Sequence, residues 1–346
     1  MYADQYKSKR SGQSVVHKQD PIEQSAYQQS LDTGSQPARL TTSAVRYWSD
    51  FSRTFYHPRS LSQLYDFELN SSIRPFDRFS MGSELFDSLE RDEDMVDRDF
   101  RPFVEECDRM QGVQLFATLD DAWGGFAGRY LASLRDEYPK TCLWLWGLTS
   151  PMNQIPREKR QARISNTAQS IAEACSLASM VVPLSLPERL PARVASIDVT
   201  SPWHVSGVLS TAVETALLQT RLSSAARQGA QPLSMWDVTD GLNTSGTQTL
   251  ARLRMSVGDS AKTAKGNGDE EEEEDEDQVD FFGLGQMKGS LAKAGRNRIF
   301  GQLSSYRGSS TSKEDEEPSE EADSRIRRLP GDPIIQRQDL SKYPFP

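Results

Sequence analysis

Cysteines are scarce in this chain, and long apolar runs are missing. The three cysteines among its 346 residues are Cys107, Cys142 and Cys175. Their odd number and wide spacing exclude a disulfide framework and the spacing of a zinc site, and they fit a reducing compartment. No apolar run approaches the ~18–20 residues that span a bilayer. Residues 1–20 contain no apolar stretch of the kind that defines a secretory signal.

An excess of positive charge is also missing. The chain has 40 basic and 50 acidic residues, a net charge of −10. A protein that binds nucleic acid with its whole surface is normally basic, so we expect no direct nucleic-acid partner. Hydrophobic residues make up 36% of the chain, which is low for a single globule. The sequence therefore predicts that ordered and disordered parts share the chain.

The common catalytic patterns do not occur. His17, His57 and His204 have no Cys or Asp partner at a known catalytic spacing. No G-x-S-x-G elbow is present, so a Ser-His-Asp hydrolase is not indicated. From these patterns we predict no catalytic residues and no metal ligands.

Composition divides the chain into three parts. Residues 1–41 are rich in Gln, Ser and charge without a sustained period, and we expect a disordered lead-in. Residues 42–256 carry the periodic apolar pattern of a folded domain. Residues 257–346 form an acidic low-complexity tail that includes the unbroken acidic run Asp269–Asp277. Such a run is usually solvated, and a basic partner for it is the minority interpretation.

Apolar periodicity predicts the elements of the folded domain. The first structured segment carries Val45, Trp48, Phe51 and Phe55 at helical spacing, and we expect a helix there that Pro58 ends. We expect further helices near the end of 76–89 and over 97–110, 126–138, 165–180 and 205–222. Short apolar strands are expected at 113–119, 141–148 and 181–184. Trp144 and Trp146 fall on one face of their strand, so we expect them in the core.

The centre of this pattern is a glycine turn after the strand 113–119. Asp120 and Asp121 end the strand, and Gly124, Gly125 and Gly128 follow before a helix. A glycine turn at a helix N-terminus can bind phosphate, or it can simply be a tight turn. The spacing is not that of a P-loop or of G-x-G-x-x-G. The two carboxylates could hold a metal or water, or they could cap the helix.

Several segments resemble the tubulin superfamily and, within it, the Misato family, which is also called the Drosophila-Misato-like family in fungi. Residues 103–113 are similar to the tubulin helix that ends in Cys-x-x-x-Gln-Gly-Phe. Residues 45–51 (Val-Arg-Tyr-Trp-Ser-Asp-Phe), 57–60 (His-Pro-Arg-Ser) and 120–128 resemble the Misato family more closely. The resemblance covers about residues 42–255.

This resemblance implies a tubulin/FtsZ-like, Rossmann-like α/β fold with a parallel sheet flanked by helices. It implies a role in mitochondrial distribution, morphology and inheritance, including the partitioning of mitochondrial DNA. The implied partners are mitochondrial or cytoskeletal proteins, and the implied location is the cytoplasm and the mitochondrion, peripheral to the membrane at most. The implied ligand of Gly124, Gly125 and Gly128 is GTP, with Trp203 near the position of tubulin's purine-stacking tyrosine.

The sequence departs from tubulin at the positions that handle nucleotide. Nothing in residues 1–40 resembles tubulin's first strand and Gly-Gln-x-Gly-Asn-Gln loop, so we expect the N-terminal part of the domain to be lacking. Phe126 and Ala127 stand where tubulin has hydroxyl residues. Residues 241–246 resemble the Gly-x-Leu-Asn-x-Asp loop, but Ser245 replaces its aspartate, and a hydroxyl cannot activate water as a carboxylate does.

We therefore predict a non-catalytic tubulin-like protein of mitochondrial inheritance, with no cofactor and at most a vestigial nucleotide site at Gly124, Gly125, Gly128 and Trp203. The alternative is a GTP-binding or GTP-hydrolysing cytoskeletal protein that polymerises. A third hypothesis is an α/β enzyme that uses Asp120 and Asp121 with a metal.

Overall fold

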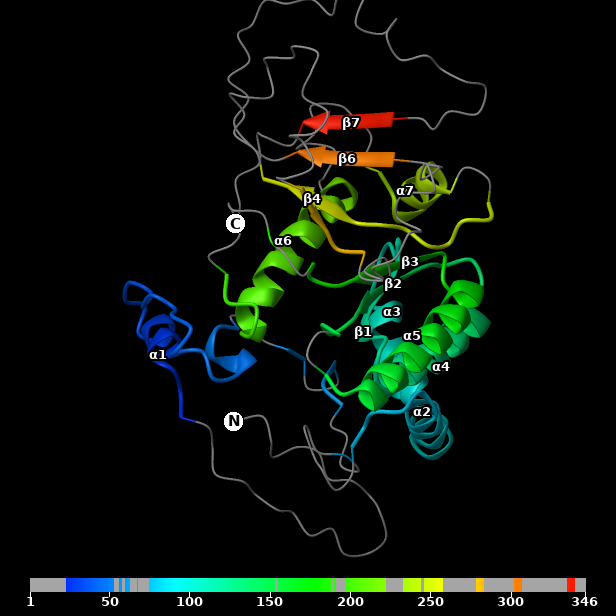
Figure 1. Ribbon diagram of the computed structural model, residues 1–346, viewed down its shortest axis with the longest axis horizontal. Helices are drawn as coiled ribbons and strands as arrows, with labels where there is room; N and C mark the ends of the chain where they lie inside the picture. The colour runs from blue at the N-terminus through cyan, green and yellow to red at the C-terminus, as the bar shows by residue number, and fades with distance from the viewer. Residues whose placement is uncertain are drawn as a thin grey trace, which may run out of the picture. The chain divides into compact units, whose positions relative to one another are not determined.

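Three short apolar runs form a parallel sheet in the computed structural model (Figure 1). Strands β1 (Gly112–Thr118), β2 (Cys142–Leu148) and β3 (Met180–Leu184) lie in the order β1-β2-β3, with Gly112 opposite Cys142 and Trp144 opposite Met180. β2 is buried along almost its whole length. A strand between two others in a parallel sheet is covered on both faces, which is why residues 142–148 are continuously apolar.

The structure describes residues 23–52, 56–57, 60–62, 67, 75–152, 155–187, 190, 197–221, 233–243, 246–257, 278–282, 302–306 and 335–339. The chain divides into two units. The first comprises Met1–Tyr65 and Asp198–His204, and the second comprises Asp66–Ile197 and Val205–Pro346. The sheet belongs to the second unit.

One face of the sheet is covered by a layer of helices. α4 (Ala122–Glu137) connects β1 to β2, and α5 (Arg157–Leu177) connects β2 to β3. α2 (Phe79–Glu93) packs against both helices, as Figure 1 shows. A π-helical turn, η3 (Val96–Phe100), and the short helix α3 (Arg101–Glu105) lead into β1. This alternation of strands and helices is the α/β architecture that the sequence predicts.

The opposite face carries a cluster of buried apolar side chains. Side chains of β2 and β3 pack there against α6 (Pro202–Arg221) and α7 (Met235–Leu242). Trp144 and Trp146 are both 2% exposed, so their predicted place in the core is confirmed. The buried members of the cluster are Cys142, Trp144, Trp146, Met180, Val182, Leu184, Val208, Ala212, Val213, Leu217, Met235, Val238, Val279 and Phe281.

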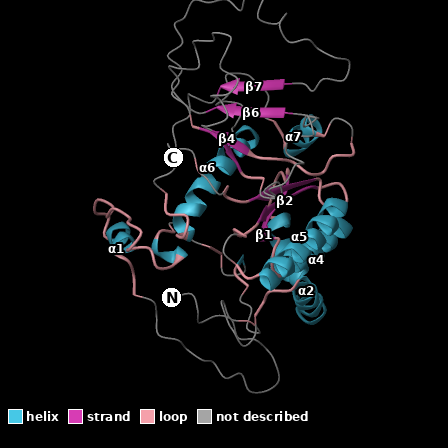
Figure 2. Cartoon of the chain, in the orientation of Figure 1, coloured by secondary structure: helices cyan, strands magenta, loops and turns pink. Residues whose placement is uncertain are grey.

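The outer edge of β3 is covered by a later part of the chain. Residues 249–251 run alongside Val181 in the parallel sense, with two backbone hydrogen bonds. The chain continues into β4 (Arg254–Ser256), which pairs antiparallel with β5 (Gln278–Asp280). β6 (Gln302–Tyr306) and β7 (Ile335–Asp339) form a second small parallel pair, visible with the other strands in Figure 2.

The first unit is built from short elements. α1 (Ala26–Asp32) begins at Ser25, whose hydroxyl accepts a hydrogen bond from the backbone N–H of Gln28. A single 3-10 turn, η1, covers Trp48–Asp50. Of the described helices in either unit, none is both long and apolar enough to cross a bilayer.

Several predicted boundaries need correction. Where a helix was expected from Val45, residues 46–47 form a bend and η1 follows, and the expected end of that helix at Phe55 and Pro58 lies outside the described residues. The helix expected over 97–110 is a π-helical turn and α3, which ends at Glu105. The lead-in contains α1 at 26–32. Residues 278–282 of the expected tail enter the core of the second unit, where Val279 and Phe281 are 0% exposed. Such short pieces have too few turns to show a period, so tertiary contacts decide their structure.

Candidate functional site

The carboxyl ends of β1 and β2 are joined by one buried carboxylate. The Asp120 side chain is 2% exposed. Its Oδ2 accepts a hydrogen bond from the backbone N–H of Ser150 at 3.0 Å and lies 3.8 Å from Nε of Arg163. This edge of a parallel sheet is where α/β proteins bind ligands. Here the lone pairs of Asp120 already serve the loop after β2 and helix α5.

Asp121 is the N-cap of α4. Its Oδ1 accepts hydrogen bonds from the backbone N–H of Trp123, at 2.9 Å, and from the hydroxyl of Thr118. Burial raises the pKa of the Asp121 carboxyl, and these two hydrogen bonds oppose the rise. The first turn of a helix is the position at which an anion would bind. Asp121 places its own carboxylate there, so a phosphate would have to displace it.

The glycines predicted as a turn lie inside α4, because the helix begins at Ala122. A Cβ on Gly124 would lie 2.0 Å from Oγ of Ser170, and one on Gly125 would lie 2.0 Å from the backbone oxygen of Phe79. A Cβ on Gly128 would lie 2.8 Å from the carboxyl carbon of Glu173. The expected glycine turn is therefore a helix start whose glycines allow α2 and α5 to approach closely.

A fourth glycine, on α2, makes the tightest of these approaches. A Cβ on Gly82 would lie 1.7 Å from the backbone oxygen of Ala122, at the first turn of α4. Phe126 and Ala127, which the resemblance to tubulin predicts at the positions of hydroxyl residues, are 9% and 5% exposed. The rings of Phe126 and Phe86 meet edge to face with centroids 5.2 Å apart. The start of α4 is thus packed with apolar groups.

Two buried polar residues of α5 hold the backbone around the carboxyl end of β1, and the sequence analysis did not predict them. The side-chain amide of Asn166 donates to the backbone oxygens of Asp120 (3.1 Å) and Asp77 (2.7 Å), and its Oδ1 accepts from the N–H of Phe79 at 3.1 Å. The hydroxyl of Ser170 donates to the backbone oxygen of Leu119 at 2.9 Å. Asn166 and Ser170 are four residues apart and therefore share one face of α5. Other polar residues surround them in the sequence, so no local pattern singles them out.

Trp203 belongs to the first unit, whereas the three glycines belong to the second. Its ring lies beside that of His204, with centroids 5.4 Å apart. His204 in turn holds the local backbone, because its Nδ1 accepts from the N–H of Asp198 at 3.1 Å. Its Nε2 lies 3.1 Å from the hydroxyl of Thr42. The three glycines thus lie together on one helix of the second unit, and Trp203 is described by its contacts within the first unit.

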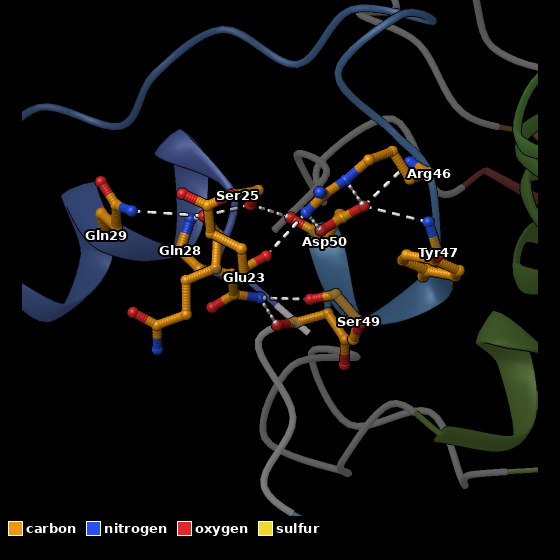
Figure 3. Close-up of polar contacts among 10 residues, drawn as sticks. Glu23, Ser25, Gln28, Gln29, Arg46, Tyr47, Ser49 and Asp50 are labelled. Carbon is orange, nitrogen blue, oxygen red and sulfur yellow. Dashed lines mark hydrogen bonds and ion pairs between the residues drawn. The ribbon is translucent and has the colours of Figure 1, made fainter. Parts of the chain in front are cut away.

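The Tyr-Trp-Ser-Asp segment of the first unit is organised by Asp50 (Figure 3). The Asp50 side chain is 3% exposed and pairs with the Arg46 guanidinium at 3.2 Å. Its Oδ2 also accepts from the backbone N–H groups of Arg46 and Tyr47, at 2.8 and 3.0 Å. The hydrogen bond from the Arg46 side chain, followed by these backbone bonds, lowers the pKa of Asp50.

The same segment is tied to α1. The Ser25 hydroxyl donates to the backbone oxygen of Asp50 at 2.9 Å, and the Gln28 amide donates to that of Ser49 at 2.8 Å. Arg46 donates to the backbone oxygen of Glu23 at 2.7 Å. The motif that carried the family resemblance therefore builds a polar joint between residues 23–28 and 45–52.

The segment 241–246 is described only in part. Gly241 and Leu242 end α7, and Asn243 accepts a hydrogen bond from the N–H of Gln248 at 2.8 Å. Ser245, which the resemblance predicts at the position of tubulin's aspartate, lies outside the described residues. Within the described ranges, no group of three or more His, Cys, Asp or Glu side chains is placed to hold a metal ion.

These features, a parallel α/β sheet with a helix start at its carboxyl edge, agree with comparisons to known proteins. Residues 37–222 match the family described as "Tubulin domain". The chain belongs to this tubulin-domain family.

Comparison with individual proteins places the chain in a narrower group within this family. The chain is 49% identical to Protein DML1 of Gibberella zeae over 340 aligned residues. This alignment covers 96% of this chain and 64% of that protein. It is 48% identical over 250 residues to Protein dml-1 of Neurospora crassa (71% of this chain, 45% of that protein) and 30% identical over 223 residues to Protein misato homolog 1 of Bos taurus (62% and 38%). The predicted membership of the DML1/Misato group is thereby confirmed, and the chain spans about two thirds or less of each of these relatives.

Proposed function

We propose that this chain is a non-catalytic, tubulin-like scaffold in mitochondrial distribution, morphology and inheritance, including the partitioning of mitochondrial DNA. The observation that carries the non-catalytic part is the packed start of α4. Gly124 and Gly125 are used for close contact with Ser170 and Phe79. Asp121 places a carboxylate on the N–H of Trp123, which opposes a bound phosphate.

The proposed partners are mitochondrial or cytoskeletal proteins, with no direct nucleic-acid contact. The net charge of −10 supports the second part, because the DNA backbone would repel such a surface. The proposed location is the cytoplasm and the surface of the mitochondrion. The mitochondrial part rests on the resemblance to the Misato family.

We propose that no cofactor is required and that Gly124, Gly125 and Gly128 form at most a vestigial nucleotide site. The test is equilibrium binding of labelled GTP, together with phosphate release in the presence of Mg²⁺. We expect release equal to that of a protein-free blank. The matched variant is Asp121→Asn, because an asparagine can keep the N-cap and accept the Thr118 hydrogen bond.

Steady release above the blank that is lost in Asp121→Asn would overturn the proposal and favour a metal-assisted enzyme. Release that persists in Asp121→Asn, with sedimentable polymers formed in GTP, would favour the polymerising GTPase instead.

The mitochondrial role has its own test. In cells of the source species whose gene is switched off, we expect clumped mitochondria and loss of mitochondrial DNA. Re-expression of the full-length protein with Asp121→Asn should restore both as well as the unaltered protein does, since no catalytic carboxylate is needed. Normal mitochondria after complete loss of the protein would overturn the role.

A further inference from the structure

Helix α5 buries polar side chains and exposes apolar ones. Asn166, Thr167 and Ser170 are buried, whereas Ile164 is 50% exposed. Apolar residues follow Ile164 at spacings of four, three and four, and together they are Ile164, Ala168, Ile171 and Cys175. Alternating spacings of three and four are the pattern by which one helix packs against another. We call these four residues the α5 seam.

The α5 seam lies on the side of its helix that faces away from α4. Ser170 and Glu173 face α4, because they lie closest to a Cβ built on Gly124 and on Gly128. At 100° per residue, the centre of the seam is roughly 160° around the helix axis from this pair. Figure 1 shows α5 beside α4 in the helix layer. The seam is therefore the outer edge of that layer.

The sheet continues past α5 by one extended segment. Val181 of β3 pairs with Leu250. Val181 faces the helix layer, because its neighbours Met180 and Val182 belong to the cluster on the opposite face. Leu250 shares the face of Val181 and is 37% exposed. Among the described elements, the helix layer thus ends before the sheet does, and the α5 seam and Leu250 remain partly exposed beside each other's strands.

The seam is complementary to itself when one of two copies is reversed. In an antiparallel pair centred between Ala168 and Ile171, Ile164 faces Cys175 of the partner subunit and Ala168 faces Ile171 of the partner subunit. Two-fold symmetry repeats both contacts. Each isoleucine then meets a smaller side chain, which is the alternation that fills a helix interface without voids. In a parallel pair, each residue would instead face its own copy.

The charge at the ends of the seam favours the same orientation. Arg157 and Arg160 continue the line of the seam into the first turn of α5 and are exposed. Reversal places them beside the last turn of the second α5, which contains no basic residue. The C-terminal end of a helix dipole is negative and attracts cations. A parallel pair would bring the arginines of the two copies together.

From the exposed seam, its match of large to small side chains and the charge at its ends, we propose that two copies of this chain associate through α5 in an antiparallel pair. The second α5 continues the helix layer on the side of Leu250. The contact is isologous, so it closes on itself and the assembly stops at a dimer. A polymerising protein would need a head-to-tail contact instead.

Sedimentation velocity of the full chain measures this association. We expect a monomer–dimer equilibrium with the dimer populated at about 50 μM, as for an interface of micromolar affinity. Ala168→Arg puts a charge at the centre of the seam, on an exposed helix position that tolerates arginine, and should weaken the dimer about tenfold or more. A chain that stays monomeric, or that forms larger polymers, would overturn the proposal.

The matched control is Gln169→Arg, which makes the same change of charge at an exposed position about 100° further around α5. Its dimer should be as stable as that of the unaltered chain. Circular dichroism should show the same helix content in both variants, so that a loss of dimer in Ala168→Arg is not a loss of fold. Equal weakening by the two substitutions, or a dimer that Ala168→Arg leaves intact, would overturn the assignment to the seam.

Disulfide trapping tests the antiparallel register. In a chain with Cys107→Ser and Ile164→Cys, diamide accepts the two thiol hydrogens, and the new thiol should form a disulfide with Cys175 of the partner subunit. Within one chain these two positions are roughly 16 Å apart along the helix, too far for a disulfide. Mass spectrometry should find peptides that contain positions 164 and 175 in a covalent dimer. Dimers linked mainly through two copies of position 164, or no covalent dimer, would overturn the antiparallel pair.

Discussion

Replacing Gly125 by Ala tests whether the glycines of α4 serve packing or a ligand. The new Cβ would lie 2.0 Å from the backbone oxygen of Phe79 and 2.8 Å from Oγ of Ser83. Since the first of these is a backbone atom, α2 has to move, and overpacking of this kind costs about 3 kcal/mol. Alanine returns about 1 kcal/mol of helix propensity. We expect Gly125→Ala to lower the free energy of unfolding by about 2 kcal/mol.

Gly207→Ala is the control for helix propensity alone. Gly207 lies in α6, and a Cβ there meets no atom within 4 Å. This variant should gain about 1 kcal/mol, so the two substitutions should differ in sign. Urea unfolding followed by circular dichroism measures both, with a loss of 2 kcal/mol moving the midpoint by about 1 M. If Gly125→Ala is as stable as the unaltered chain, Gly125 is not required for packing against α2, and the hypothesis that it serves a ligand is favoured instead.

Three further outcomes are expected. Gly124→Ala should lower the free energy of unfolding, and adding Ser170→Ala should recover part of this loss because it removes the Ser170 Oγ that lies 2.0 Å from the new Cβ. If the two substitutions change the free energy of unfolding additively in a double-mutant cycle, the contact is contradicted. The pKa of Asp50 is lowered in the folded state, so its stabilisation exists above about pH 4 and is lost as pH falls through the folded value. The protection of the Tyr47 amide against hydrogen exchange, measured relative to the intrinsic rate at each pH, should therefore fall in acid in the unaltered chain. Asp50→Asn should show reduced protection at neutral pH as well, and unchanged protection in the variant would contradict this expectation. The pKa of Asp121 is raised in the folded state, so its charge opposes folding at neutral pH, and this cost fades as pH falls through the folded value towards the unfolded one. Chemical unfolding at pH 7 should show that Asp121→Asn is no less stable than the unaltered chain and that Asp121→Ala is about 1 kcal/mol less stable. Equal losses in both variants would mean that the charge itself is needed.

Periodicity gave good predictions for the long elements of the second unit. Residues 113–148 were predicted as strand, helix and strand, and β1, α4 and β2 occupy 112–118, 122–137 and 142–148. A seven-residue apolar run or a four-turn amphipathic segment carries enough repeats to identify its period. The same local pattern correctly placed Trp144 and Trp146 in the core.

Short segments were predicted less well because their partners are distant in sequence. Residues 278–282 follow the acidic run and look like tail, yet Phe281 is held by hydrogen bonds with Ser185 and Leu253. The spacing of Val45, Trp48 and Phe51 suggests a helix. Asp50 instead captures two backbone N–H groups of residues 46 and 47 and favours a turn.

The sequence by itself determined the α/β class, the succession of strands and helices along the chain and the family resemblance, because these depend on local period and on motifs of contiguous residues. Only the tertiary structure decided what Gly124, Gly125 and Gly128 do. A glycine is compatible with a phosphate turn and with a close helix contact, since both need the space of a missing Cβ. That space is filled here by Ser170, Phe79 and Glu173, which lie on α2 and α5, each 45 or more residues away in the chain from the glycine it meets. No local pattern of residues 120–128 reports these contacts.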